Sequence, residues 1–234
     1  MIAAQLLLTA DFMSRKAIMH RDLKPENVLL NSKKEGVFDI RIADFGFAMV
    51  DTGDQRSRHD KKTACGTPGY VDPAVLAGKG SSFKSDIFSI GSIVFSILTL
   101  RNLISGNNYS EIIDKNKKFT LEKINFRMKD CSVEGRDLTK WLLKREPSDR
   151  PTASEALSHP WFSGERLPLK VSLHYNIAVT ENKSRDASPM RSHDVCHYVD
   201  YAQSKMQASP ISGKPQTAQA FGPMEFHFRQ SHRA

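Results

Sequence analysis

A short polar segment near the beginning of the chain carries side chains whose types and spacing could perform phosphoryl transfer. In HRDLKPENVLL (residues 20–30), Asp22 and Asn27 are five residues apart and Lys24 lies between them, while Asp44 follows in ADFGFA. The side-chain oxygens of Asn27 and Asp44 are hard ligands, of the kind that holds Mg²⁺ between a protein and phosphates. Asp22 is then a carboxylate that can orient a hydroxyl nucleophile, and Lys24 is a positive charge that can neutralise the transferred group. A polar surface turn is the plainer interpretation, but it does not account for DFG 17 residues after Asn27.

The segments on either side predict the elements that must hold these residues in place. Apolar side chains recur near helical spacing over residues 1–17, which no Gly or Pro interrupts, so this stretch is predicted to be a helix. NVLLNS and DIRIADFG flank the polar connection SKKEG, which predicts a β-hairpin with Asp44 at the end of its second strand. Residues 47–66 are polar and predict a long exposed loop.

Helices are predicted to dominate the residues that follow. The longest apolar stretch, IFSIGSIVFSILTL, has 14 residues and falls short of the roughly 20 that span a bilayer, so it indicates a buried core helix. The helices predicted here cover residues 86–100, with Ser85 as N-cap, 109–116, 134–144, and a short helix opened by the capping-box pair Thr152 and Glu155.

Composition and charge indicate an ordinary globular domain. The 234 residues are 39% hydrophobic and 26% charged, with a net charge of +8. The basic residues are scattered, without a Lys/Arg block interleaved with stacking aromatics, so we do not expect nucleic acid as a partner. Three widely separated cysteines, outside any Cys-x-x-Cys pair, indicate reduced thiols and a cytoplasmic or nuclear location. The start, MIAAQLLL, has no basic residue before its apolar run and no cleavage site, so we expect neither a signal peptide nor a membrane partner.

The composition changes after HPWF (159–162). Residues 180–234 are rich in Ser, Gln, Ala, Pro and His, and such a segment buries too little apolar surface to offset its ordering entropy. We therefore expect residues 163–234 to form a basic, largely disordered tail. Between 167 and 179 apolar residues alternate with others, which favours an extended segment over a helix.

Five motifs in this order resemble the C-terminal lobe of a eukaryotic protein kinase, over residues 1 to about 162. HRDLKPENVLL is similar to the catalytic loop, ADFGFA to the metal loop and CGTPGYVDPAVL to the end of the activation segment. SDIFSIGSIVFSILT and LLKREPSDRPTASEALSHPWF are similar to the central and closing helices. The resemblance implies a mostly α (α+β) fold, namely a kinase-like C-terminal lobe with a small β-hairpin, with the N-terminal lobe absent and a flexible C-terminal tail.

The resemblance also implies roles for the residues of the first two motifs. Asp22 is the catalytic base, Lys24 contacts the γ-phosphate of ATP, and Asn27 and Asp44 hold Mg²⁺. Leu29 would form the floor under adenine. ATP and Mg²⁺ are the cofactors so implied, and the reaction is transfer of the γ-phosphate to a protein hydroxyl.

Two residues indicate the class of acceptor. Lys24 and Thr67 are what serine/threonine kinases carry, and the Thr67 hydroxyl would tie Asp22 and Lys24 together. The motifs look most like the calcium/calmodulin-dependent kinase group. That group usually places a helical calmodulin-binding segment after the domain, but the alternation over 167–179 predicts an extended segment, so we do not expect calmodulin as a partner.

Substrate preference and regulation follow from the same resemblance. Glu26 is the residue that meets an Arg of the substrate in basophilic members, whereas Ser96 stands where those relatives often place a Glu, so a basic substrate context is left open. Arg21 precedes the catalytic Asp, and in kinases with that Arg it meets a phosphate on the activation segment. We expect an upstream kinase to phosphorylate Thr63, with Ser57 as the alternative acceptor.

Further residues have structural roles in this resemblance. His20 and Phe45 would stack toward Asp86 of the central helix. The family motif APE reads Asp72-Pro73-Ala74 here, so the glutamate that pairs with a buried Arg, here Arg150, is missing. Asp72 could supply that charge, or it could simply cap the helix that Pro73 opens.

A complete member of the family has a whole N-terminal lobe before its HRD, and only nineteen residues precede it here. The sequence contains no Gly-rich phosphate loop, strand lysine, partner glutamate or hinge, so we expect this chain alone to transfer phosphate poorly. Two alternatives stay open. One is a non-catalytic, pseudokinase-like docking module, and the other is a truncated record of a longer active kinase.

Overall fold

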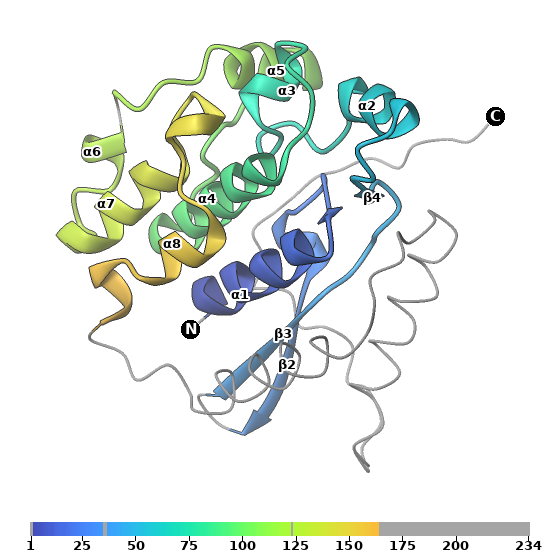
Figure 1. Cartoon of the computed structure of the whole chain (residues 1–234). Coiled ribbons are helices and arrows are strands. Elements are labelled where there is room, and N and C mark those ends of the chain that lie inside the picture. The colour runs from blue at the N-terminus through green and yellow to red at the C-terminus, as the bar shows by residue number, and fades with distance from the viewer. Residues whose placement is uncertain (1, 35–36, 123, 164–234) are drawn as a thin grey trace.

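Helices make up most of the structure, and a small hairpin projects from them (Figure 1). The structure, a computed structural model, describes residues 2–34, 37–122 and 124–163. A mostly α fold with a small β-hairpin is confirmed. In chain order the elements are α1 (Ile2–Arg15), β1 (Ile18–Met19), β2 (Val28–Lys34), β3 (Val37–Ile42), β4 (Met49–Val50), α2 (Gln55–Lys62), α3 (Pro73–Leu76), α4 (Phe83–Thr99), α5 (Tyr109–Lys117), α6 (Ile124–Arg127), α7 (Val133–Leu142) and α8 (Ala153–Leu157), with 3-10 turns at Pro25–Asn27, Pro147–Asp149 and Pro160–Phe162.

Helix α4 lies at the centre of the core. Its Phe88 and Phe95 are completely buried, and α1 and α7 pack against it. The predicted buried helix is confirmed, but its start is corrected. The N-cap is Ser82, and Ser85 lies inside the first turn, where its Oγ accepts a hydrogen bond from the Ser82 N–H at 3.1 Å. Either serine suits the sequence pattern, and only the extended backbone at Ser82 decides between them. Over the described residues, no helix is long and apolar enough to cross a membrane.

The predicted hairpin is confirmed as β2 and β3, and it carries part of the site. The strands are antiparallel, with Val28 opposite Ile42. The second strand ends at Ile42 and not at Asp44, because the chain turns away there. The Ala43 N–H bonds to the Asn27 carbonyl at 2.9 Å, and Asp44 has a left-handed backbone with φ of 59°. Such a conformation cannot continue a strand.

The prediction of one long exposed loop over 47–66 is wrong for part of that range. β4 pairs with β1, with Val50 opposite Ile18, and α2 follows it. The carboxylate of Asp54 caps α2 by accepting the N–H of Ser57 at 2.7 Å. Among the residues of α2 only Ser57 is buried, so the helix has no apolar period that sequence could show.

The other predicted helices are confirmed as α5, α7 and α8. Thr152 and Glu155 form the predicted capping box: the Thr152 hydroxyl accepts the Glu155 N–H at 3.1 Å, and the Glu155 carboxylate accepts the Thr152 N–H at 2.7 Å. The predicted tail, residues 163–234, lies outside the described residues beyond its first residue. The alternating stretch at 167–179 and Cys196 lie outside them too.

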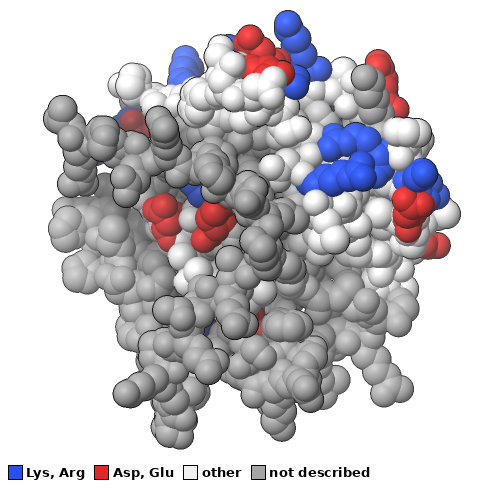
Figure 2. Space-filling model, turned by 180° about the vertical axis from the view of Figure 1, so that it is seen from behind, with Lys and Arg blue, Asp and Glu red and all other residues white. Residues whose placement is uncertain are grey.

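Charged side chains of both signs are mixed on the face shown in Figure 2. Where that face belongs to the described chain, Lys and Arg lie beside Asp and Glu, without one continuous basic field. Such mixing is typical of a solvated surface. Cys65 and Cys131 are free thiols. In the described ranges, no group of three or more His, Cys, Asp or Glu side chains is placed to hold a metal ion.

Candidate active site

Two side chains converge on the carboxylate of Asp22. The Thr67 hydroxyl donates to Oδ1 of Asp22 at 2.7 Å, and the Lys24 ammonium lies 2.8 Å from Oδ2. Lys24 Nζ also donates to Thr67 Oγ1 at 2.9 Å, so the three side chains form a closed triangle. Asp22 is 3% exposed. Each carboxylate oxygen has a partner, so the plane of the carboxylate is fixed before any substrate arrives.

The side chain of Asn27 also bonds to Asp22, chiefly through the Asp22 backbone carbonyl. Its Nδ2 donates to the Asp22 backbone carbonyl at 2.9 Å and lies 3.4 Å from Asp22 Oδ2. Because the amide nitrogen is committed to Asp22, the amide oxygen is the atom of Asn27 left for a cation. The Asn27 carbonyl in turn accepts the N–H of Ala43, which places the residue before Asp44 beside Asn27.

Asp44 lies on the loop that follows β3 and is exposed. One of its carboxylate oxygens accepts the Gly46 N–H at 3.2 Å. A neutral amide oxygen and a carboxylate fit Mg²⁺, which prefers hard oxygen ligands and usually keeps water and phosphate oxygens as well. Asn27 and Asp44 would therefore hold the cation. Leu29, the residue expected to lie under the adenine, is on β2, and its apolar side chain is 44% exposed.

His20 packs against Phe45, with ring centroids 4.8 Å apart. Its Nε2 lies 3.2 Å from the Ala43 carbonyl, and its Nδ1 accepts the Asp22 N–H at 3.3 Å. A neutral imidazole satisfies both contacts, with the proton on Nε2. Burial lowers the pKa of His20 below its ordinary value, against the opposing charge of Asp86. His20 thus joins residues 20–27, which contain the expected catalytic base and are here called the catalytic segment, to the loop that carries Asp44.

Asp86, from the first turn of α4, fixes the backbone of the catalytic segment. Its two carboxylate oxygens accept the N–H groups of His20 and Arg21 at 2.8 and 2.9 Å. Arg21 has φ of 67°, a left-handed conformation that costs energy for a residue with a side chain. The paired bonds to Asp86 hold it there. Burial raises the pKa of Asp86 above its ordinary value, although these two N–H bonds oppose the rise.

The Arg21 guanidinium extends from the catalytic segment to the segment that contains α2. It donates to the Phe47 carbonyl at 2.6 Å and to the Asp60 carbonyl at 2.9 Å. The Asp60 carbonyl also accepts the N–H of Thr63, the exposed residue that ends α2. Arg21 and Thr63 therefore share one acceptor.

Ser57, the alternative phosphate acceptor, lies in a different environment. It is buried, and its hydroxyl donates to Asp51 at 2.9 Å. Lys61 bonds to the same carboxylate. Burial alone would raise the pKa of Asp51, but the bonds from Lys61 and Ser57 lower it below its ordinary value.

Asp72 performs both of the roles that the sequence presented as alternatives. The two terminal nitrogens of Arg150 donate to its two carboxylate oxygens at 2.6 and 2.7 Å. One of those oxygens also accepts the Ala74 N–H at 2.9 Å and so caps α3. The Ser85 hydroxyl donates to the other oxygen at 3.0 Å.

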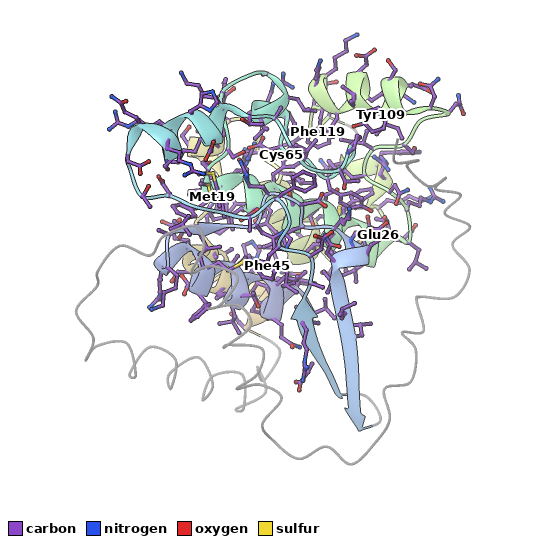
Figure 3. All side chains as sticks on the ribbon, turned by 90° about the vertical axis from the view of Figure 1, so that its right-hand side faces the viewer. Met19, Glu26, Phe45, Cys65, Tyr109 and Phe119 are labelled. Atoms are coloured by element: carbon purple, nitrogen blue, oxygen red, sulfur yellow. The ribbon has the colours of Figure 1, made fainter. Side chains whose placement is uncertain are left out.

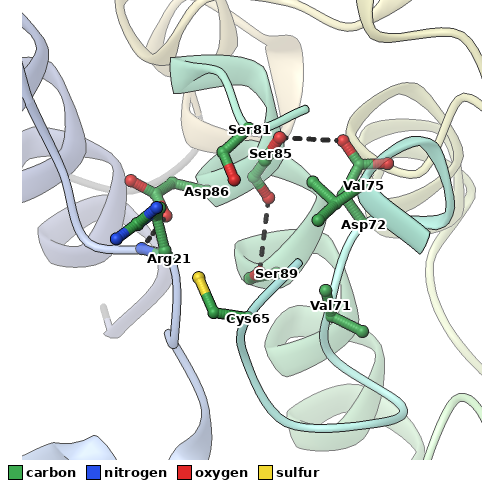
Figure 4. A pocket seen from close by; sticks show the side chains of 9 residues that line it. All are labelled: Arg21, Cys65, Val71, Asp72, Val75, Ser81, Ser85, Asp86 and Ser89. Carbon is green, nitrogen blue, oxygen red and sulfur yellow. Dashed lines mark hydrogen bonds between the residues drawn. The ribbon is translucent and has the colours of Figure 1, made fainter. Parts of the chain in front are cut away.

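A small cavity of about 10 Å³ lies behind the catalytic segment, where Arg21, Asp86 and Cys65 face it (Figure 4). This is space for about one water molecule and excludes a nucleotide. Burial raises the pKa of the Cys65 thiol above its ordinary value. The thiol is therefore not activated as a nucleophile.

Tyr70 interacts with Glu26 and Ser96, the two residues that the resemblance connects with substrate preference. Burial, together with the charge of Glu26, raises its pKa to about 12, and a hydrogen bond with Ser96 opposes this. Glu26 itself is exposed, at the turn from which the hairpin begins (Figure 3). Tyr70 therefore feels the charge of Glu26 and bonds to Ser96.

Asn116 was not predicted to be a functional residue, but it is buried and bonds to the backbone on both sides of Tyr70. No motif marks it. The one available signal was a polar residue on a short helix with apolar neighbours, and that pattern does not identify what the residue bonds to.

The amino-acid sequence is similar to those of known proteins. Residues 1–162 match the model of a family described as protein kinase domain. Among curated proteins, the chain is similar to a protein of Plasmodium falciparum (isolate K1 / Thailand) named probable serine/threonine-protein kinase 2, with 31% identity over 190 residues. The matched region is 81% of this chain and 35% of that relative, so the chain spans about a third of the length of the relative it matches.

Proposed function

Because the chain belongs to the protein kinase family, we propose that it transfers the γ-phosphate of ATP to serine or threonine hydroxyls of proteins. The observation that carries the proposal is the closed triangle of Asp22, Lys24 and Thr67. Phosphoryl transfer asks a protein chiefly for positioned groups and charge, and this triangle supplies both.

In the proposed reaction Asp22 accepts the proton of the acceptor hydroxyl. The hydroxyl oxygen then forms a bond to the γ-phosphorus, while the bond from that phosphorus to the leaving oxygen breaks and releases ADP. Lys24, whose ammonium lies 2.8 Å from Asp22, provides positive charge where the transferred group passes. Thr67 keeps both side chains in place through its hydroxyl.

Mg²⁺, when bound, would neutralise phosphate charge and orient the phosphates. Asn27 and Asp44 are the residues proposed to hold it, and Leu29 is proposed to contact the adenine. His20, Phe45 and Asp86 are proposed to support these residues. His20 packs on Phe45, and Asp86 accepts the backbone N–H groups of His20 and Arg21. In this proposal residues 1–162 correspond to the C-terminal lobe of a kinase, closest to the calcium/calmodulin-dependent group but without calmodulin as a partner.

The proposed regulation is phosphorylation of Thr63 by an upstream kinase. A phosphate there would bring a charge of about −1.5 to −2 close to Arg21 and the basic side chains of α2. The proposed acceptor is a protein, and the exposed carboxylate of Glu26 is proposed to meet an arginine in it. The proposed location is cytoplasmic or nuclear, in keeping with free thiols at Cys65 and Cys131.

The test is a phosphotransfer assay on residues 1–234 with Mg²⁺, radiolabelled ATP and a serine peptide that contains arginines. We propose that transfer is slow, since a single missing preorganised donor costs about 10²–10³ in rate and this sequence has no Gly-rich loop or strand lysine. Slow labelling that disappears in Asp22→Asn supports the proposal. Equal labelling, or equal absence of labelling, in both proteins after long incubation contradicts it.

A further inference from the structure

The side chain of Asn116, on α5, bonds to a backbone segment that leads directly into the active site. We propose that Asn116 is a positioning residue for the acceptor protein: it holds residues 69–71, here called the platform, beside the Asp22–Thr67 pair. This inference rests on the proposed kinase function and adds to it a residue outside every motif of the sequence.

The amide of Asn116 bonds to the platform at both ends. Its Oδ1 accepts the Gly69 N–H at 2.7 Å, and its Nδ2 donates to the Val71 carbonyl at 2.9 Å. The residue is 0% exposed. A side-chain amide can donate and accept side by side, which is what two main-chain groups on either side of Tyr70 require. Shortening this side chain to a methyl group would leave a buried N–H and a buried carbonyl without partners.

Helix α4 holds the platform from the other side. The Ser92 hydroxyl donates to the Gly69 carbonyl at 3.0 Å, and the Ser89 hydroxyl donates to the Tyr70 carbonyl at 2.9 Å. The two remaining N–H groups of the platform bond to the Thr67 carbonyl at 3.1 and 3.0 Å. Every backbone polar group of the platform therefore has a partner, and each of its three carbonyls is held by a side chain.

Packing at Gly69 shows that α5 and its neighbours restrict the platform closely. Gly69 has φ of +92°, and a Cβ atom there would lie 3.3 Å from the Ile104 carbonyl oxygen and 3.8 Å from a methyl group of Ile112, on α5. The platform is thus enclosed between α4 and α5. On the α5 side, the two hydrogen bonds of Asn116 hold the platform backbone in this position.

The platform is where an acceptor chain must pass. An acceptor hydroxyl has to come within hydrogen-bond reach of Asp22, and Thr67, two residues before the platform, already bonds to Asp22 at 2.7 Å. The residues that flank the acceptor hydroxyl therefore run over the surface next to Thr67. A displacement of about 1 Å in such a positioning element can cost roughly 10² in rate. ATP, by contrast, is proposed to bind at Asn27 and Asp44, which Asn116 does not contact.

The test compares Asn116→Ala with Asn108→Ala in the full chain. Asn108 is the matched control, because it is an asparagine on the same helix that accepts the Glu111 N–H at 2.9 Å as N-cap and is exposed. Loss of this cap weakens α5 without touching the platform. Two measurements are made: hydrogen exchange of the peptide that spans residues 66–71, and initial rates of labelling of the arginine-containing serine peptide at varied peptide and varied ATP.

We expect Asn116→Ala to speed exchange of 66–71 and to raise the KM for the peptide, each by at least about tenfold, the scale of a buried hydrogen bond left unmade. The KM for ATP should change less than twofold. Asn108→Ala should leave the exchange of 66–71 and the peptide KM within about twofold of the parent.

Each other outcome contradicts the inference in a recognisable way. Equal effects of the two variants would mean that the platform responds to general loosening of α5. Faster exchange with an unchanged peptide KM would mean that Asn116 has only a structural role. If the parent labels the peptide no faster than Asp22→Asn, the proposed function fails and the acceptor role fails with it, whereas hydrogen exchange still decides whether Asn116 fixes the platform.

Discussion

The guanidinium of Arg150 bonds to both carboxylate oxygens of Asp72, at 2.6 and 2.7 Å, and neither side chain has any exposed surface. The two residues are 78 positions apart in the chain. They join the segment that follows the platform to the turn before α8. Because the same carboxylate caps α3, one side chain contributes to a buried ion pair and to a helix start.

We predict that Asp72→Ala lowers the free energy of unfolding by about 3–5 kcal/mol, because it leaves the buried Arg150 charge unpaired. Loss of the helix cap alone would account for about 1 kcal/mol. Asp72→Asn is the matched variant, since its amide oxygen can still accept the Ala74 N–H while the charge is gone. Urea titrations should give Asp72→Asn most of the loss seen in Asp72→Ala, and a value close to the parent protein would show that the cap dominates.

A second prediction concerns the hydroxyl of Thr67. Thr67→Ala should lower kcat for peptide phosphorylation by about 10², because both Asp22 and Lys24 lose the group that holds them in place. Thr67→Ser retains the hydroxyl and should stay within a few-fold of the parent. The two variants should unfold at similar urea concentrations. If Thr67→Ala retains full kcat, the triangle does not position the catalytic carboxylate.

A third prediction concerns Thr63. Phosphorylation at this exposed residue should raise the rate of peptide phosphorylation, and Thr63→Ala should abolish the increase. The reason is that Arg21 already bonds to the Asp60 carbonyl, to which the Thr63 N–H also bonds, so a phosphate on Thr63 would lie close to the guanidinium. Thr52→Ala is the control, as an exposed threonine of the same segment outside this contact. Mass spectrometry after treatment with an upstream kinase identifies the modified residue. Activation that persists in Thr63→Ala, with phosphate on Ser57, would assign the role to Ser57.

A fourth prediction concerns pH. The pKa of His20 is lowered in the folded protein from an ordinary value of 6.5 by burial, so the unfolded chain takes up this proton first as the pH falls. The free energy of unfolding is therefore independent of this group well above pH 6.5. It falls progressively below that pH, down to the lowered pKa of the folded state. Urea titrations between pH 7.5 and 5.5 should show this decline. His20→Gln should reduce the slope, and an unchanged slope would show that other groups cause it.

Local pattern accounts for much of the fold. The apolar run at 87–100 indicated a buried core helix, because its length excludes a membrane span. The polar break between NVLLNS and DIRIADFG marks the hairpin, and Thr152 with Glu155 marks the start of α8 for the same local reason. In each case the interactions that matter join residues close together in the chain.

The elements that the sequence did not reveal are those stabilised by contacts between distant or nonperiodic residues. Helix α2 has no apolar face. It depends on the cap by Asp54 and on the bonds of Ser57 and Lys61 to Asp51. Ser82, and not Ser85, is the N-cap of α4 because the backbone is extended at Ser82. From the sequence, pairing with Arg150 and capping of α3 were alternatives for Asp72. The carboxylate does both, since its two oxygens have several acceptor sites.

The sequence by itself determined the identities and order of the proposed reactive side chains, because Asp22, Lys24 and Asn27 are close in the chain and Asp44 follows the adjoining hairpin. Only the tertiary structure decided what holds them. Thr67 reaches Asp22 across 45 residues, and Asn116 reaches the platform across 47. Contacts over such separations depend on how α4 and α5 pack, and packing is a property of the assembled core that no local spacing encodes.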